Sequence, residues 1–151
     1  KVNDEHGHLA GSQILREVAF VLQRQLAQTT SLPCRYGGDE FTVILLDCNL
    51  AQGIEVAERI RRAIQDWTFL PMAIGPGEPA LNLKGVITMS IGVASYRRHC
   101  PPGRPGPEQK NELLKKADTA LYQAKEAGKN CVIGASRESG PPSFSSVLLK
   151  T

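Results

Sequence analysis

The chain has 151 residues and a net charge of +3, with 41% hydrophobic, 22% charged and 5% aromatic residues. This length fits one compact domain with a real core, and the charge is too small to imply binding to nucleic acid or to a membrane surface. No apolar stretch approaches transmembrane length, and the four cysteines lack the C-x-x-C spacing of a zinc site, so we expect reduced thiols.

The first half of the chain alternates between helical and extended patterns. Apolar residues recur every three or four positions in two segments, and an apolar run follows a pair of glycines. The elements expected here are a helix over 12–28, strands over 34–36 and 40–47, and a helix over 50–66. Asn49 is the expected N-cap of the second helix, and the strand over 40–47, apolar on both faces, is expected in a covered central position.

The second half is expected to continue with a long strand, a helix and a closing strand. The elements expected here are a loop over 73–80, a strand over 84–95, a loop over 101–107, a helix over 111–127 and a strand over 130–133. Gly128 stands at the expected C′ position of the helix. Because the Ser-, Pro- and Gly-rich sequence of 136–151 has no periodicity, we expect a disordered tail or a linker there. This order of elements predicts an α+β fold, with helices covering a mainly antiparallel sheet.

The most informative motif is the turn Gly37-Gly38-Asp39-Glu40-Phe41. Glycines allow backbone conformations closed to other residues and let a ligand approach the main chain. Two adjacent carboxylates provide the oxygen ligands that Mg²⁺ prefers alongside substrate phosphates. The motif therefore indicates nucleotide chemistry, although a solvent-exposed hairpin turn without any chemistry uses the same residue types.

Further short motifs follow one another in a fixed order along residues 1–135. They are Val2-Asn3-Asp4, Gly7-His8, Gly11, Arg35-Tyr36 before the turn, Ala57-Glu58-Arg59-Ile60-Arg61, Thr88-Met89-Ser90-Ile91-Gly92-Val93-Ala94, Ala117-Asp118, Ala120-Leu121-Tyr122, Ala124-Lys125 and Gly128-Lys129-Asn130. With this set of motifs the chain resembles the GGDEF domain, the diguanylate cyclase domain of bacterial signalling proteins. The resemblance implies a nucleotidyl-cyclase, palm-like fold with a ferredoxin-like core, a domain over 1–135, and the turn as a hairpin tip.

The resemblance implies that the domain condenses two GTP molecules into cyclic di-GMP and pyrophosphate, with Mg²⁺ or Mn²⁺ as cofactor. Each domain of the family holds one GTP, so the implied partner is a second copy in a homodimer, assembled by an upstream sensory or receiver module in the cytoplasm. The family's domain starts with a strand that carries a D-x-D-x-F-K motif and a metal-binding aspartate, and Lys1 follows that position. Without this strand, the fragment itself is expected to be catalytically inactive.

The resemblance also assigns roles to the residues of the turn. Asp39 and Glu40 are the implied catalytic and metal-binding carboxylates. For Glu40, the alternative is a charge at the edge of a strand. Gly37 and Gly38 are the implied substrate-binding glycines, which let the turn lie close to the ribose and phosphates of the nucleotide.

Four further residues are implied to bind GTP. Lys125 and Lys129 match phosphate-binding positions, although lysines near a helix C-terminus also complement the helix dipole. The family usually has arginine where Lys129 stands, so a bidentate contact is lost there. Asn3 matches the position whose amide meets the guanine edge. Ser12 stands where the family usually has a guanine-binding aspartate; its alternative role is the N-cap of the first helix.

Two functions from different classes therefore remain. The intact turn favours an active diguanylate cyclase, whereas Ser12 and Lys129 favour a catalytically inactive GGDEF module that binds GTP or mediates dimerisation to regulate a neighbouring domain. A palm domain acting on nucleic acid is disfavoured, because the chain has no basic stripe interleaved with aromatic residues. The inhibitory R-x-x-D motif of many family members is replaced by residues 28–31, Gln-Thr-Thr-Ser, so we predict no product inhibition through this site.

Overall fold

The computed structural model describes residues 2–100, 106–136 and 146–151. Its helices are α1 (Val2–Leu26), α2 (Leu50–Asp66), α3 (Tyr96–His99) and α4 (Pro107–Glu126). Its strands are β1 (Ser31–Gly37), β2 (Glu40–Leu46), β3 (Thr68–Phe69), β4 (Leu83–Lys84), β5 (Ile91–Ser95), β6 (Val132–Gly134) and β7 (Ser146–Lys150).

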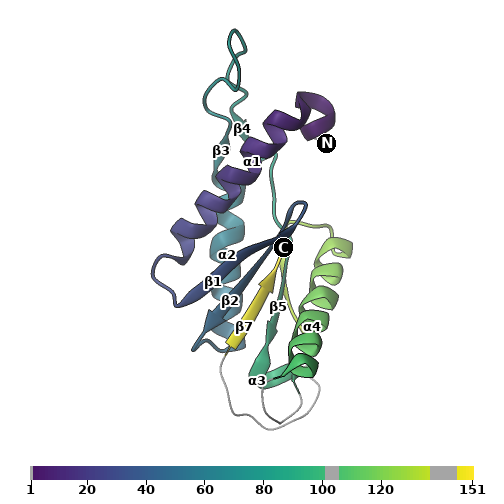
Figure 1. The fold of residues 1–151 in the computed structure, drawn as a ribbon. Coiled ribbons are helices and arrows are strands. Elements are labelled where there is room, and N and C mark those ends of the chain that lie inside the picture. Colours follow the sequence, from purple (N-terminus) through teal and green to yellow (C-terminus); the bar gives the residue numbers. More distant parts are fainter. Residues whose placement is uncertain (1, 101–105, 137–145) are drawn as a thin grey trace.

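Five of these strands form one sheet in the order β1-β2-β7-β5-β6. All neighbouring pairs are antiparallel except β5 and β6, which run parallel. Helices α1 and α2 lie on one side of the sheet and α4 lies on the other (Figure 1). The predicted α+β fold with helices over a mainly antiparallel sheet is therefore confirmed. As predicted, β2 occupies a covered position inside the sheet, between β1 and β7.

The two faces of the sheet bury different side chains, because successive residues of a strand point to opposite sides. The face towards α1 and α2 carries large apolar residues, namely Phe41, Val43, Leu45, Ile91, Val93, Val147 and Leu149. The face towards α4 carries a smaller cluster, in which Ala94 and Leu148 of the strands meet Ala117 and Ala120 of the helix. The main core therefore lies between the sheet and the α1–α2 pair.

The predicted ends of two helices are confirmed. Asn49 caps α2 in a reciprocal capping box: its side chain accepts from the Gln52 N–H at 3.0 Å, and its own N–H donates to the Gln52 side chain at 2.9 Å. Gly128 follows the end of α4 with φ +105°, a left-handed conformation that glycine adopts without strain. Helix α4 itself begins at Pro107, earlier than predicted, because proline fits the first turn of a helix.

The first helix is longer than the sequence pattern predicts. It begins at Val2 and continues to Leu26 across a kink at Gly7, where φ is 79° and ψ is 166°. Ser12 consequently lies inside α1, and the alternative interpretation of Ser12 as an N-cap is wrong. The apolar periodicity failed to indicate the first turns because most of their side chains are exposed.

The single strand predicted over 84–95 is two separate strands. Gly85, with φ +71°, ends β4, which pairs with β3 in a small sheet of its own. The central sheet begins again only at Ile91 with β5, and the short helix α3 follows directly. Residues 73–80 contain no helix or strand, as predicted, whereas 101–105 of the predicted loop over 101–107 lie outside the described residues.

The largest difference from the sequence-based expectation concerns 136–151. Residues 146–150 form β7 in the middle of the sheet rather than a tail, and 137–145 lie outside the described residues. Val147, Leu148 and Leu149 are all buried, so this short apolar run fills space between β2 and β5. Among the described residues, no helix combines the length and the apolar composition needed to cross a membrane.

Candidate functional site

The motif turn is the tip of the hairpin formed by β1 and β2. Gly37 pairs with Glu40, and Gly38 and Asp39 form the two-residue connection. Gly38 has φ +53°, which explains the need for glycine there. The Arg35 guanidinium donates to the Gly38 carbonyl oxygen from Nε at 2.9 Å and from Nη2 at 2.6 Å, and so braces the turn.

The tip is open on its outer side. Asp39 and both glycines are exposed, and a Cβ built on Gly37 or Gly38 would meet no other atom within 4 Å. This open surface leaves room for a ligand against the main chain, as the sequence motif predicts. The Asp39 carboxylate is presented at this surface.

Glu40 contacts Lys150 of β7, and two further groups surround the same ammonium. Its Oε2 lies 4.0 Å from the Nζ of Lys150 in β7. The same Nζ lies 2.6 Å from Oδ1 of Asp118 in α4, and 4.6 Å from the ring centroid of Tyr36 in β1. The Lys150 ammonium therefore stands between two carboxylates, beside an aromatic ring.

Lys150 is buried, with only 7% of the residue exposed, and it nevertheless keeps its charge. Burial by itself lowers the pKa of this ammonium, because desolvation disfavours the charged form. The hydrogen bond to Asp118 and the negative charges of Asp118 and Glu40, with a contribution from Tyr36, outweigh that effect and raise the pKa above its ordinary value. Lys150 is consequently a permanent cation at this position.

A divalent metal ion does not fit these residues in the observed arrangement. No three Asp, Glu, His or Cys side chains of the described segments gather as metal ligands. Mg²⁺ requires several oxygen ligands at about 2.0–2.1 Å, and the Lys150 ammonium instead occupies the space between Glu40 and Asp118. Asp39 lies alone at the tip, so we assign no catalytic step to a metal ion.

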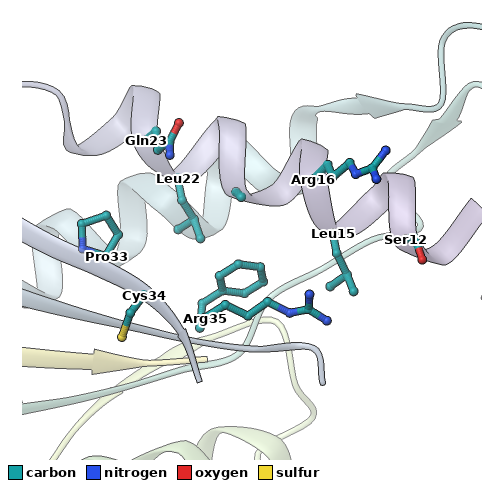
Figure 2. A pocket seen from close by; sticks show the side chains of 10 residues that line it. Ser12, Leu15, Arg16, Leu22, Gln23, Pro33, Cys34 and Arg35 are labelled. Carbon is teal, nitrogen blue, oxygen red and sulfur yellow. The ribbon is translucent and has the colours of Figure 1, made fainter. Parts of the chain in front are cut away.

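A cavity of about 440 Å³ lies on the opposite side of the hairpin, between α1 and β1. Figure 2 shows Leu15 and Leu22 pointing from α1 towards the hairpin, with the extended side chain of Arg35 passing below Leu15. Ser12 and Arg16 line the same cavity from α1. The cavity therefore has an apolar wall and three polar lining residues, Ser12, Arg16 and Arg35.

The structure brings only some of the predicted site residues together. Ser12 lines the cavity beside the hairpin. Asn3 lies against Gly11, the residue before Ser12, because a Cβ on Gly11 would collide with the Asn3 amide oxygen. Lys125 is exposed in the last turn of α4. Lys129 lies beyond the helix end with φ +64°, so the two lysines do not share one helical face. Their predicted roles in binding GTP stay predictions.

Sequence reasoning missed three participants at the tip. Arg35 was noted only as part of a motif, and its contact with Gly38 depends on the geometry of the turn. Asp118 likewise belonged to a motif without receiving a role. Lys150 lay in the expected tail, and its only signal was the apolar run that precedes it.

Comparison with known proteins agrees with this architecture. The family model of the GGDEF domain of diguanylate cyclases matches residues 1–131. The response regulator PleD of Caulobacter vibrioides is 39% identical over 134 residues, which cover 89% of this chain and 26% of PleD. Diguanylate cyclase A of Treponema denticola is 33% identical over 131 residues, covering 87% of this chain and 31% of that protein. The chain thus spans about a third or less of these relatives.

Among solved structures, the coiled coil and GGDEF domain of DgcB from Caulobacter crescentus, in complex with c-di-GMP, is similar with a TM-score of 0.67. It is 30% identical, and the match covers 88% of this chain and 62% of that one. The expected nucleotidyl-cyclase, palm-like fold is thereby confirmed, together with the resemblance that predicted it. The motif turn at a hairpin tip, the sheet topology and the match over residues 1–131 lead to one conclusion: the chain belongs to the GGDEF domain family of diguanylate cyclases.

Proposed function

We propose that this chain is the cyclase domain of a protein that condenses two GTP molecules into cyclic di-GMP and pyrophosphate. The observation that carries the proposal is the intact Gly37–Phe41 turn at an open hairpin tip, with the Asp39 carboxylate exposed and the backbone braced by Arg35. The relative from Treponema denticola is named a diguanylate cyclase, and this supports the assignment. We propose that the domain comprises the matched segment, residues 1–131, together with β7, which lies in the middle of the same sheet.

The reaction needs two nucleotides in opposite orientations. Each ribose 3′-oxygen forms a bond to the α-phosphorus of the other GTP, the bond from that phosphorus to the β-phosphate oxygen breaks, and pyrophosphate leaves. Asp39 is positioned to accept a hydrogen bond or a proton from the attacking hydroxyl. Since one tip presents one such carboxylate, a second copy of the domain completes the site in a homodimer.

Binding of GTP is assigned to the remaining predicted residues. Asn3 and Ser12 bind the guanine edge near the cavity of α1, and Lys125 and Lys129 bind phosphates. Gly37 and Gly38 give the nucleotide access to the main chain. PleD is named a response regulator, which supports an upstream receiver or sensory module as the partner that assembles the dimer. We place the protein in the cytoplasm, where GTP is available.

A second function, a non-catalytic module that binds GTP or dimerises to regulate a neighbouring domain, is favoured by one observation. Lys150 lies 4.0 Å from Glu40, one of the two carboxylates that the resemblance assigns to Mg²⁺ or Mn²⁺, and an ammonium at this position favours a chain that does not turn GTP over. Ser12 in place of the family's aspartate points the same way. The two functions differ in whether cyclic di-GMP is ever formed.

The test is GTP turnover with Mg²⁺, with products resolved by chromatography and mass. The chain is expressed with whatever its gene encodes before Lys1. We expect cyclic di-GMP from the parent sequence, and none from Asp39→Asn. Asp66→Asn, at another exposed aspartate, at the end of α2, is the matched control and should retain turnover. A folded dimer of the parent sequence that binds GTP and forms no product would establish the non-catalytic module instead.

A further inference from the structure

The position of Lys150 is fixed by the strand that carries it. β7 pairs with β2 on one side and with β5 on the other, and in this register Lys150 lies opposite Thr42 and Gly92. The next residue, Thr151, makes two hydrogen bonds with Phe41. The Thr151 N–H donates to the Phe41 carbonyl oxygen at 3.1 Å, and the Phe41 N–H donates to Thr151 Oγ1 at 2.9 Å. The pairing of β7 with β2 and β5 therefore fixes the position of Lys150.

The alternation of β7 directs Lys150 to the face covered by α4. Val147 and Leu149 pack in the large core on the side of α1 and α2, whereas Leu148 packs with the alanines below α4. Lys150 falls on the same side as Leu148, where Asp118 and Glu40 receive it. Figure 1 shows the chain's C-terminal end close to the hairpin tip between β1 and β2.

The groups around the ammonium are those that a hard cation would use. Two carboxylates face it. Thr42, opposite Lys150 in the strand register, carries a buried hydroxyl that has no hydrogen-bond partner among the described residues. A divalent ion bound to Oε2 of Glu40 would lie at most about 6 Å from Nζ, given the 4.0 Å between Nζ and Oε2 and a metal–oxygen distance of about 2 Å. With Lys150 so little exposed, solvent screens the resulting repulsion weakly.

We propose that β7 is an inhibitory strand: seated between β2 and β5, it holds the Lys150 ammonium against Glu40 and Asp118 and keeps divalent cations off these carboxylates. Occupation of the sheet by β7 and occupation of Glu40 by a metal ion then oppose each other, and this opposition is reciprocal. The regulatory meaning of the contact rests on the proposed cyclase function, whereas the exclusion of the metal ion does not.

The experiment measures Mn²⁺ binding to the 151-residue chain without nucleotide, by the loss of the free Mn²⁺ signal in electron paramagnetic resonance. Lys150→Met removes the charge and keeps an unbranched side chain of similar length. We expect this variant to bind Mn²⁺ about tenfold or more tightly than the parent chain, because the opposing charge is gone. Lys150→Arg, which keeps a cation, should remain close to the parent affinity.

Two further variants make the outcome specific. Lys84→Met, an exposed lysine on β4 in the separate small sheet, is the matched control and should leave Mn²⁺ affinity unchanged. Adding Glu40→Gln to Lys150→Met should remove the gain, because Glu40 would be the ligand released. Circular dichroism of each variant verifies that the fold is retained.

Equal Mn²⁺ affinity of the parent chain, Lys150→Met and Lys150→Arg would overturn the proposal and leave Lys150 as a structural ion pair. A gain in Mn²⁺ affinity for folded Lys150→Met would support the inhibitory strand whether or not GTP is turned over, because the cyclase function is tested separately by the turnover experiment described above. The inhibitory strand and the cyclase function can therefore each be refuted without refuting the other.

Discussion

The two faces of the central sheet differ in the size of the side chains between the strands and the covering helices. On one face, α1 and α2 are held away from the strands by large side chains such as Leu22, Ile60 and Ile64, each at most 2% exposed. On the other face, α4 lies directly on the backbone: a Cβ on Gly92 would collide with the Ala117 carbonyl oxygen and the Leu121 nitrogen. The first face supplies buried apolar area, and the second fixes one helix at a close distance.

This difference explains where polar chemistry is found. Large side chains cover most of the first face, and most of the apolar burial that stabilises the fold lies there. The second face carries small residues and leaves room at its end for Lys150, Glu40 and Asp118. Because Asp118 directly follows Ala117, the close approach of α4 at Gly92 also sets the distance from Asp118 to Lys150. Most of the apolar burial and the ion pairs of Lys150 thus lie on opposite sides of the same strands.

The largest expected effect comes from removing a buried side chain on the large-residue face, the face of the sheet towards α1 and α2. Ile60→Ala removes a side chain that is 1% exposed, and we expect the free energy of unfolding to fall by about 3–4 kcal/mol. Urea unfolding followed by circular dichroism measures the change. Val86→Ala, at a position that is 60% exposed, is the control and should have little effect. A loss below about 1 kcal/mol for Ile60→Ala would mean that this face is not the principal core.

The second-largest effect is expected from adding a methyl group to the small-residue face, the face of the sheet towards α4. Gly92→Ala places a methyl group against the backbone of α4, which cannot rotate away, so we expect destabilisation by about 2–3 kcal/mol. Gly37→Ala is the control, because a Cβ there meets no other atom within 4 Å. Urea unfolding of both variants measures the difference. Equal stability of the two would show that α4 moves freely over the sheet.

Local signals in the sequence explain why much of the fold was predictable. Asn49 and Gly128 mark helix ends through contacts within a few residues, and the paired glycines mark the hairpin. The apolar periodicity of 50–66 coincides with α2 because one face of that helix packs on the sheet. The turn motif itself led to the family, since its residue types and spacing are rare together.

The centre of the sheet was not predictable, because β7 depends on its neighbours. Three apolar residues, Val147 to Leu149, are too short a run to indicate a strand within a Ser- and Pro-rich segment. These residues form a strand only because β2 and β5 provide hydrogen bonds on both sides. The contacts of Lys150 with Glu40 and Asp118 follow from that placement, and no local pattern encodes them.

A smaller effect is expected where α2 meets β7 on the large-residue face. Gly53 is a helical glycine, and replacement by alanine would usually stabilise a helix by about 1 kcal/mol. Here its Cβ would lie 2.5 Å from Val147 Cγ1, so we expect Gly53→Ala to destabilise the chain by about 1 kcal/mol net. In a Val147→Ala background the clash is removed, and the same substitution should become neutral or stabilising in urea unfolding. Additive effects of the two substitutions would contradict direct contact.

The smallest expected effect concerns His99 of α3, at the end of the small-residue face. The residue is 5% exposed, and its Nδ1 accepts from the Ser95 N–H at 3.0 Å. Burial, and then the charges of Arg98 and Lys116, lower the pKa of His99 below 6.5 in the folded chain, while backbone contacts oppose the shift. Above pH 6.5 the imidazole is neutral in both states, so it contributes no pH dependence there.

As the pH falls below 6.5, the unfolded chain takes up the proton first, and His99 therefore makes the free energy of unfolding decrease until its folded pKa is passed. His99→Gln lacks this titration, so its stability should decline less between pH 7 and pH 5 than that of the parent chain. Urea unfolding at several pH values measures the two slopes, and His8→Gln at an exposed position is the matched control. Parallel slopes for the parent chain and His99→Gln would show that His99 takes up a proton as readily in the folded chain as in the unfolded one.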